Sequence, residues 1–328
     1  MREVQPTGRT VAAADIEAAS RTIQPHIHRT LVFASETLSR LTGNTVFLKA
    51  ENLQKTGSFK ARGGANAILG LTLEQKSRGV IVVSAGNHGA GVAYGARIAG
   101  VQATVVMPET AMHSKIAAVE GYGARVKLVD PARLMESMEE IRQEQGQTFI
   151  HPFEHPSVIA GQGTVGLEIL DQLPNVEVIV VPVGGGGLLS GIAAYVRRTK
   201  PSIAIVGVEP KGSNVVSQSL AAGYPLALAH FESIADGLNA PWSGPISLGL
   251  IREFVDDVVT VDDDAIGAAM GTVLERVKMV VEPAGAAAVA ALLQGVVPHI
   301  QGKRVVAILS GGNVDLSRIG TLVSRQTK

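Results

Sequence analysis

Short β-branched runs alternate with Ala-rich segments of helical character along most of this chain. Runs of this kind lie at residues 80–83, 178–183 and 305–309, and each leads into a corner that contains glycine. This alternation predicts βα units, in which helices cover a parallel sheet. Similar runs predict further strands at 103–107, 203–208 and 258–261, and the opening segment predicts a helix that begins near Asp15 and ends by Pro25.

Three corners stand out because they combine glycine with polar side chains. They follow the first three runs and read Ser84-Ala85-Gly86-Asn87-His88, Gly184-Gly185-Gly186-Gly187 and Ser310-Gly311-Gly312-Asn313. In open α/β sheets, ligands bind at the carboxyl ends of the strands. We therefore expect these three corners to form one site, although they are far apart in the sequence.

Composition and charge narrow the classes of function. The 29 basic and 29 acidic residues give a net charge of zero, so we expect neither a nucleic-acid partner nor binding to an anionic membrane. The absence of cysteine excludes disulfides, zinc–thiolate sites, iron–sulfur clusters and a thiol nucleophile. The most apolar long window, 279–297, is interrupted by Glu282, Pro283 and Gln294, which predicts a cytoplasmic chain without a membrane span.

The four consecutive glycines at 184–187 predict a phosphate site. They place free backbone N–H groups at the start of the segment LLSGIAAYVRR, where a helix dipole favours an anion. A tight turn is the simpler interpretation, but four glycines cost much chain entropy for a turn alone. The third glycine of a dinucleotide fingerprint would fall on Leu189 or Ser190, and the chain has no G-x-x-x-x-G-K-[ST] motif, so the phosphate belongs to another group.

Lys60 is the candidate nucleophile. It lies in the segment TGSFKARG, where Thr56 or Ser58 can cap a helix that continues through ANAILGL. An ammonium group in the first turn of a helix is destabilised by the dipole, which lowers its pKa as a Schiff-base lysine requires. A solvated surface lysine is the alternative, and the neighbouring Gly-Ser-Phe together with the four glycines argues against it.

Several motifs of this chain resemble those of the threonine dehydratase and serine racemase family, in the family's order. They are ENLQKTGSFKARG (51–63), SAGNHG (84–89), VIAGQGT (158–164), GGGGL (184–188), ADG (235–237), EPAGA (282–286) and SGGNVD (310–315). This resemblance implies a pyridoxal 5'-phosphate enzyme of fold type II, which is tryptophan synthase β-like: an α/β chain with two doubly wound domains. We expect a large domain from residues 1–53 and 151–328, a small domain from 54–150, and the cofactor in the cleft between them.

The resemblance also implies a role for each site residue. Lys60 would carry the cofactor, Phe59 would pack beside its ring, and the backbone of Gly184, Gly185, Gly186, Gly187 and Leu188 would hold its phosphate. Asn87 would bond the phenolic oxygen and Ser310 would meet the ring nitrogen. The substrate carboxylate would bind at the corner formed by Ser84, Ala85, Gly86, Asn87 and His88.

The role of Glu282 has two possible interpretations, and so has the question whether Glu209 binds a metal ion. Glu282 could complement the dipole of the Ala-rich helix that follows it, or, as the resemblance implies, lie near the cofactor. We expect no metal site, since the run after Glu209 (PKGSNV) has no carboxylate, although Glu209 could hold an ion weakly. Surface or packing roles are expected for the remaining histidines, among them His26, His28, His151 and His155.

The resemblance implies an ammonia-lyase that converts L-threonine, L-serine or both to a 2-oxo acid and ammonia by β-elimination. Two alternatives stay open: a dehydratase of another β-hydroxy amino acid, such as 3-hydroxyaspartate or a compound derived from hydroxyectoine, and a serine racemase. Racemases of this family resemble Ser-Ser-Gly-Asn where this chain has Ser84-Ala85-Gly86-Asn87, and the methyl group of Ala85 cannot return a proton. The family is usually dimeric or tetrameric, so we expect a homodimer or homotetramer.

Overall fold

The structure is a computed structural model that describes residues 10–324. The strands are β1 (Val32–Ala34), β2 (Thr45–Lys49), β3 (Val80–Val83), β4 (Ala103–Pro108), β5 (Arg125–Val129), β6 (Thr148–Phe149), β7 (Val178–Pro182), β8 (Ala204–Pro210), β9 (Asp257–Val261) and β10 (Arg304–Ile308). The α-helices are α1 (Ala13–Ile23), α2 (Glu36–Thr42), α3 (Lys60–Leu69), α4 (Leu73–Arg78), α5 (Asn87–Ala99), α6 (His113–Gly121), α7 (Leu134–Gln145), α8 (Pro156–Gln172), α9 (Gly187–Thr199), α10 (Val215–Ala222), α11 (Pro245–Phe254), α12 (Asp263–Thr272), α13 (Pro283–Leu293) and α14 (Leu316–Val323). Single turns of 3-10 helix form η1 (Glu51–Leu53), η2 (Lys55–Gly57), η3 (Pro131–Arg133) and η4 (Asp236–Leu238), and η5 (Val273–Val277) is a π-helical turn.

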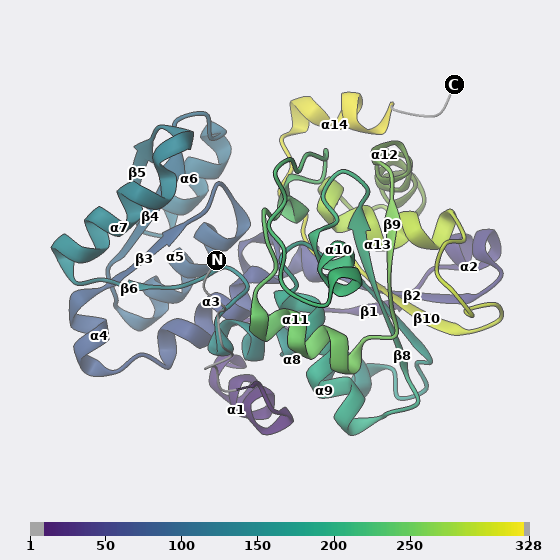
Figure 1. The fold of residues 1–328 in the computed structure, drawn as a ribbon. Helices are drawn as coiled ribbons and strands as arrows, with labels where there is room; N and C mark the ends of the chain where they lie inside the picture. Colours follow the sequence, from purple (N-terminus) through teal and green to yellow (C-terminus); the bar gives the residue numbers. More distant parts are fainter. Residues whose placement is uncertain (1–9, 325–328) are drawn as a thin grey trace.

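The strands form two sheets, which lie side by side in Figure 1. The larger sheet has six strands in the order β1-β2-β10-β7-β8-β9, and the smaller has four in the order β5-β4-β3-β6. All neighbouring strands are parallel except β1 and β2, which pair antiparallel at the edge of the larger sheet. The predicted parallel sheet is therefore confirmed apart from this edge, and all six predicted strands are present.

Helices cover both faces of the six-stranded sheet because its central strands are apolar on both sides. In β7, Ile179 and Val181 pack into one core with α1, α8, α9 and α11. Val178 and Val180 point the other way, into a second core with α12 and α13. This alternation of side chains along a strand produces the doubly wound arrangement that the sequence predicts.

The four-stranded sheet is built the same way on a smaller scale. Val80 and Val82 of β3 pack toward α5, whereas Ile81 packs with Val106 toward α7. All four strands of this sheet come from residues 80–149. The domain boundaries at 53/54 and 150/151 stay a prediction. Among residues 10–324, no helix is both long enough and apolar enough to cross a bilayer.

Candidate active site

A cavity of about 590 Å³ lies at the carboxyl ends of β3, β7 and β10. The three glycine corners that follow these strands meet there, as the sequence predicts. Its walls include every residue that the sequence analysis assigned to a cofactor or substrate. These residues are Phe59, Lys60, Ser84, Ala85, Gly86, Asn87, His88, Gly184, Gly185, Gly186, Gly187, Leu188, Glu282 and Ser310.

Lys60 is the first residue of α3 and projects into this cavity. Its Nζ donates a hydrogen bond of 3.0 Å to the carbonyl of Pro152 and lies 5.3 Å from the centre of the Phe59 ring. Burial lowers the pKa of Lys60 to about 8, and the nearby carboxyl of Glu282 opposes the shift. The predicted direction of the pKa shift is therefore found, with burial in place of the helix dipole as its main cause.

The predicted side-chain cap of this helix is wrong. Neither Thr56 nor Ser58 caps α3, and the hydroxyls of both are buried without a hydrogen-bond partner. The chain enters the helix by backbone pairing instead: Ser58 forms a β-bridge with Gly311, and the N–H of Phe59 donates to the carbonyl of Ser310. A long-range contact thus replaces the local one and joins the Lys60 segment directly to the Ser310 corner.

The glycine loop after β7 has the form of a phosphate cradle. In the described chain, no acceptor bonds the backbone N–H groups of residues 184–188, which lead into α9. Gly186 has φ +97°, a conformation that favours glycine, and a Cβ on Gly185 would lie 2.5 Å from the Phe153 ring. Free amides at a helix N-terminus suit the phosphate of pyridoxal phosphate, so the residues present fit this group.

The corner after β3 offers a second set of amides. The hydroxyl of Ser84 accepts from the N–H groups of Gly86 and Gly89, at 3.2 and 2.9 Å. The N–H groups of Asn87 and His88, in the first turn of α5, have no acceptor in the described chain. A carboxylate could bind these two amides.

Two side chains of this corner differ in their surroundings. The Nε2 of His88 lies 2.9 Å from the carbonyl of Ile150, and burial keeps the pKa of His88 well below its usual value. Ala85 is exposed on the wall of the cavity. The corner therefore presents amides and a methyl group to a ligand.

Glu282 lies in the cavity wall, at the N-cap of α13. Its side chain makes no cap hydrogen bond and is 3% exposed, and its Oε1 accepts from Nδ2 of Asn87 at 2.5 Å. The other end of the Asn87 amide accepts from Asn313 at 2.7 Å, so Asn87 is held in one orientation. Burial and the neighbouring Asp236 raise the pKa of Glu282 to about 8. Glu282 therefore lines the cavity, and its place near a cofactor stays a prediction.

Ser310 completes the set of predicted side chains. It is buried, lines the cavity, and donates from Oγ to the carbonyl of Ala284 at 3.2 Å. Contacts of these side chains with a cofactor or substrate stay predictions.

Sequence reasoning missed His151, which lines the cavity next to Lys60. Its Nδ1 accepts from the N–H groups of Phe153 and Glu154, at 3.3 and 2.9 Å, so the neutral ring carries its proton on Nε2. The ring packs edge-on against Phe149 and Phe153 and at a tilt against Trp242. The signal was its place just after β6, at the carboxyl end of a strand in the same sheet as β3.

An ion pair at the cavity was also missed. Nζ of Lys115 on α6 lies 2.6 Å from the carboxylate of Asp236 in η4. The ADG motif pointed to Asp236 without a role, and nothing in the local sequence around Lys115 marks it.

Glu209, the weak candidate for an ion, is used inside the protein. Its carboxylate accepts from the N–H groups of Val216 and Ser217, both at 2.8 Å, and from the Ser217 hydroxyl. Burial raises its pKa to about 7. Within residues 10–324, no three histidine, aspartate or glutamate side chains are grouped as a metal ion would require.

Comparison with known proteins agrees with this geometry. Residues 23–311 match the family described as "Pyridoxal-phosphate dependent enzyme". The chain is 41% identical to the L-threonine ammonia-lyase of Thermotoga maritima, over 96% of this chain and 79% of that protein. It is 43% identical to the catabolic L-threonine dehydratase TdcB of Staphylococcus aureus strain USA300, over 97% and 93% of the two chains. Among solved structures, maize serine racemase superposes with a TM-score of 0.92 at 38% identity, covering 97% of this chain and 98% of that one. The chain belongs to the family of pyridoxal-phosphate dependent enzymes.

Proposed function

We propose that this enzyme is an ammonia-lyase that converts L-threonine, L-serine or both to a 2-oxo acid and ammonia. The observation that carries the proposal is the meeting of Lys60, the free amides of 184–188 and the free amides of Asn87 and His88 on one cavity. The first group suits attachment of the cofactor, the second its phosphate and the third a substrate carboxylate. Similarity to the two threonine enzymes supports the choice of substrate.

The residues divide the reaction between them. Pyridoxal phosphate supplies an electron sink for the pair left at Cα when its proton is removed. Lys60 would carry the cofactor and, as a neutral amine, would take that proton; burial lowers its pKa to about 8, which makes the neutral amine more available near neutral pH. The β-hydroxyl would leave with a proton as water, and uptake of one water would then release the 2-oxo acid and ammonia.

Ala85 favours elimination over racemisation. Racemisation needs a proton donor on the face of the substrate opposite Lys60, and the methyl group of Ala85 has no proton to give. The hydroxyl of Ser84, next to it, accepts from two backbone amides. Since a serine racemase is among the similar structures, the comparisons leave this choice to the site itself.

The test measures both products from the same enzyme. We expect 2-oxobutanoate from L-threonine, no appreciable D-serine from L-serine by chiral chromatography, and some D-serine once Ala85→Ser is made. Borohydride reduction followed by peptide mass analysis should place the cofactor on Lys60. Abundant D-serine from the unmodified enzyme, or label on another lysine, would overturn the proposal.

A cytoplasmic location and assembly into a homodimer or homotetramer belong to the same proposal. Chromatography with light scattering measures the assembly.

A further inference from the structure

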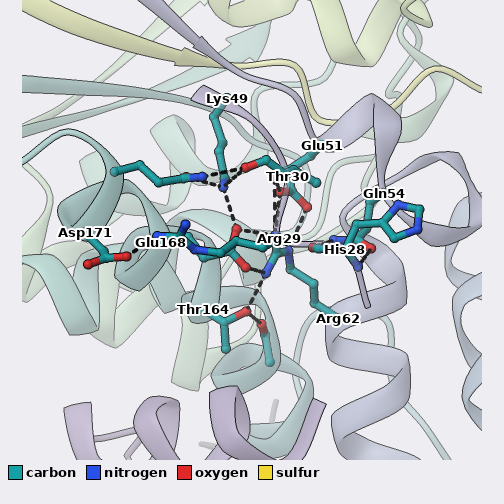
Figure 2. A network of polar contacts seen from close by, with 12 residues as sticks. His28, Arg29, Thr30, Lys49, Glu51, Gln54, Arg62, Thr164, Glu168 and Asp171 are labelled. Atoms are coloured by element: carbon teal, nitrogen blue, oxygen red, sulfur yellow. Dashed lines mark hydrogen bonds and ion pairs between the residues drawn. The ribbon is translucent and has the colours of Figure 1, made fainter. Parts of the chain in front are cut away.

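Four buried charged side chains meet behind the wall that carries Lys60. We call Lys49, Glu51, Arg62 and Glu168 the buried charge cluster; all four side chains are at most 11% exposed. Figure 2 shows them converging from different parts of the chain, namely the end of β2, η1, α3 and α8. Two cations and two anions make the buried charge cluster neutral as a whole.

Arg62 is the centre of this cluster because its guanidinium binds both carboxylates. Nε and Nη2 each lie 2.7 Å from one oxygen of Glu51, and Nη1 and Nη2 lie 2.7 and 2.9 Å from the oxygens of Glu168. Nη1 also donates to the hydroxyl of Thr164 at 3.1 Å. Two bidentate contacts fix a guanidinium in position and in rotation, which a single ammonium group cannot match.

The remaining cation joins the cluster to the edge of the larger sheet. Nζ of Lys49 donates to Glu168 at 2.5 Å, to the carbonyl of Thr30 at 3.0 Å and to Gln172 at 2.9 Å, so all three of its protons are used. Lys49 does not touch α3 through any of these bonds. Lys49 is therefore linked to α3 only indirectly, through the carboxylate of Glu168 that it shares with Arg62.

Arg62 and Lys60 share the first turn of α3 but leave it on opposite sides. Two residues correspond to about 200° of rotation in an α-helix. Lys60 accordingly reaches the cavity while Arg62 reaches the buried charge cluster. The neighbouring helices α8 and α5 also pack closely against the backbone of α3. A Cβ on Gly161 of α8 would lie 2.7 Å from the carbonyl of Arg62, and a Cβ on Gly64 would lie 2.4 Å from the carbonyl of Gly91 in α5.

We propose that Arg62 is a positioning residue, which fixes the rotation of the first turn of α3 and thereby the place of the Lys60 amine in the cavity. The inference rests on the proposed function only in taking Lys60 as the group that moves the Cα proton. No local signal holds this turn, since α3 lacks a side-chain cap. Backbone pairing with the Ser310 corner holds the residues just before the turn, and the carboxylates of Glu51 and Glu168 hold Arg62 within it.

Two double variants separate positioning from general stability. Glu51→Gln with Arg62→Met removes one cation and one anion at α3. Arg197→Met with Asp256→Asn removes one of each where the end of α9 meets the start of β9, and leaves both carboxylates that bind Arg62 in place. Neither leaves an odd buried charge, which would itself be costly. Both are expected to lower the thermal midpoint.

The readout is exchange of the Cα proton of L-alanine with D2O, expressed per bound cofactor. Alanine has no β-hydroxyl to lose, so its exchange reports proton transfer alone and misfolded protein is not counted. We expect a loss of at least about tenfold in the α3 variant and of less than about threefold in the other. Equal rates in the two variants, or an unchanged rate in the α3 variant, would overturn the proposal.

A milder pair covers the case in which a double variant does not fold. Arg62→Lys keeps the positive charge but loses the planar guanidinium that makes the bidentate contacts. Lys49→Arg is the matching exchange at the other cation. Arg62→Lys should slow alanine exchange by more than Lys49→Arg does; the reverse order counts against the proposal. Failure of the native enzyme to act on threonine would remove the proposed function alone, because alanine exchange would still report on Lys60.

Discussion

The state of His151 is set by two backbone amides. Because Nδ1 accepts from Phe153 and Glu154, the neutral ring presents an N–H donor at Nε2, and no acceptor for it is present among residues 10–324. Burial, aided by the nearby charge of Lys60, lowers the pKa of His151 to about 4. A neutral imidazole is therefore a fixed hydrogen-bond donor in the cavity, much as a backbone amide is.

This state predicts how stability depends on pH. Between pH 6.5 and about 4 the unfolded chain binds a proton at this residue that the folded chain does not, so the free energy of unfolding falls as the pH falls through that range. His151→Phe suits the aromatic neighbours and cannot titrate. At pH 5 it should remove about 1 to 2 kcal/mol of the acid destabilisation. Thermal midpoints from pH 7 to pH 4.5 measure this; equal slopes for both proteins would contradict it, although His88, whose pKa is also lowered, keeps part of the slope.

At the scale of elements, the loop that begins α9 depends on one backbone angle. Gly186 has φ +97°, and a Cβ there would lie 2.9 Å from Ile251. Gly186→Ala should strain the loop, turn its amides and weaken cofactor binding at least about tenfold. Gly223 ends α10 at φ +82° with open space around its Cβ, so Gly223→Ala is the matched control.

Both substitutions should cost about 1 kcal/mol of stability from the left-handed conformation alone. Only Gly186→Ala should change the dissociation constant of the cofactor, measured by absorbance titration. A similar change in Gly223→Ala would show that the effect is one of stability and not of the cradle.

The same scale shows what the sequence could and could not predict. The run at 80–83 forms β3 with the predicted bounds, because a strand buried on both faces is apolar throughout. β5 reads RVKLV and lies at a sheet edge with most of its side chains in water, so no apolar run marked it. The predicted cap of α3 failed because the true partner of that segment is the Ser310 corner, some 250 residues away, and local propensity carries no information about such contacts.

The residues of the site also differ in whether local sequence could predict them. Lys60 and the four glycines have local backbone or charge requirements that their own segments express. His151 has Phe149 and Phe153 beside it in the sequence, but Trp242 reaches it from a distant segment. Arg62 gains its role only when the carboxylates of Glu51 and Glu168 arrive from other elements. No pattern close to Arg62 in the sequence indicates the contact with Glu168, which lies on α8.

At the scale of the whole molecule, α6 joins the two sheets across the cavity. It belongs to the side of the four-stranded sheet, yet Lys115 pairs with Asp236 in η4 and Ser114 donates to Asp315 just before α14, at 2.6 and 2.5 Å. Figure 1 shows α6 facing α14 across the gap between the two sheets. Lys115 and Asp236 both line the cavity, so the pair links two of its walls.

Loosening this link should weaken substrate binding more than it slows the chemistry. The side chains of Lys115 and Asp236 are 19% and 44% exposed, and pairs of this kind contribute about 0 to 1 kcal/mol, or up to about fivefold in affinity. Asp236→Asn should therefore raise KM for L-threonine about two- to fivefold and leave kcat within about twofold. Since salt screens such a pair, KM of the native enzyme should rise with ionic strength and that of the variant should rise less.

Glu74→Gln breaks the exposed Arg78–Glu74 pair on α4, away from the cavity, and is the control. An equal rise in KM in Glu74→Gln, or a KM of the native enzyme that does not change with ionic strength, would show that this pair does not link the walls of the cavity.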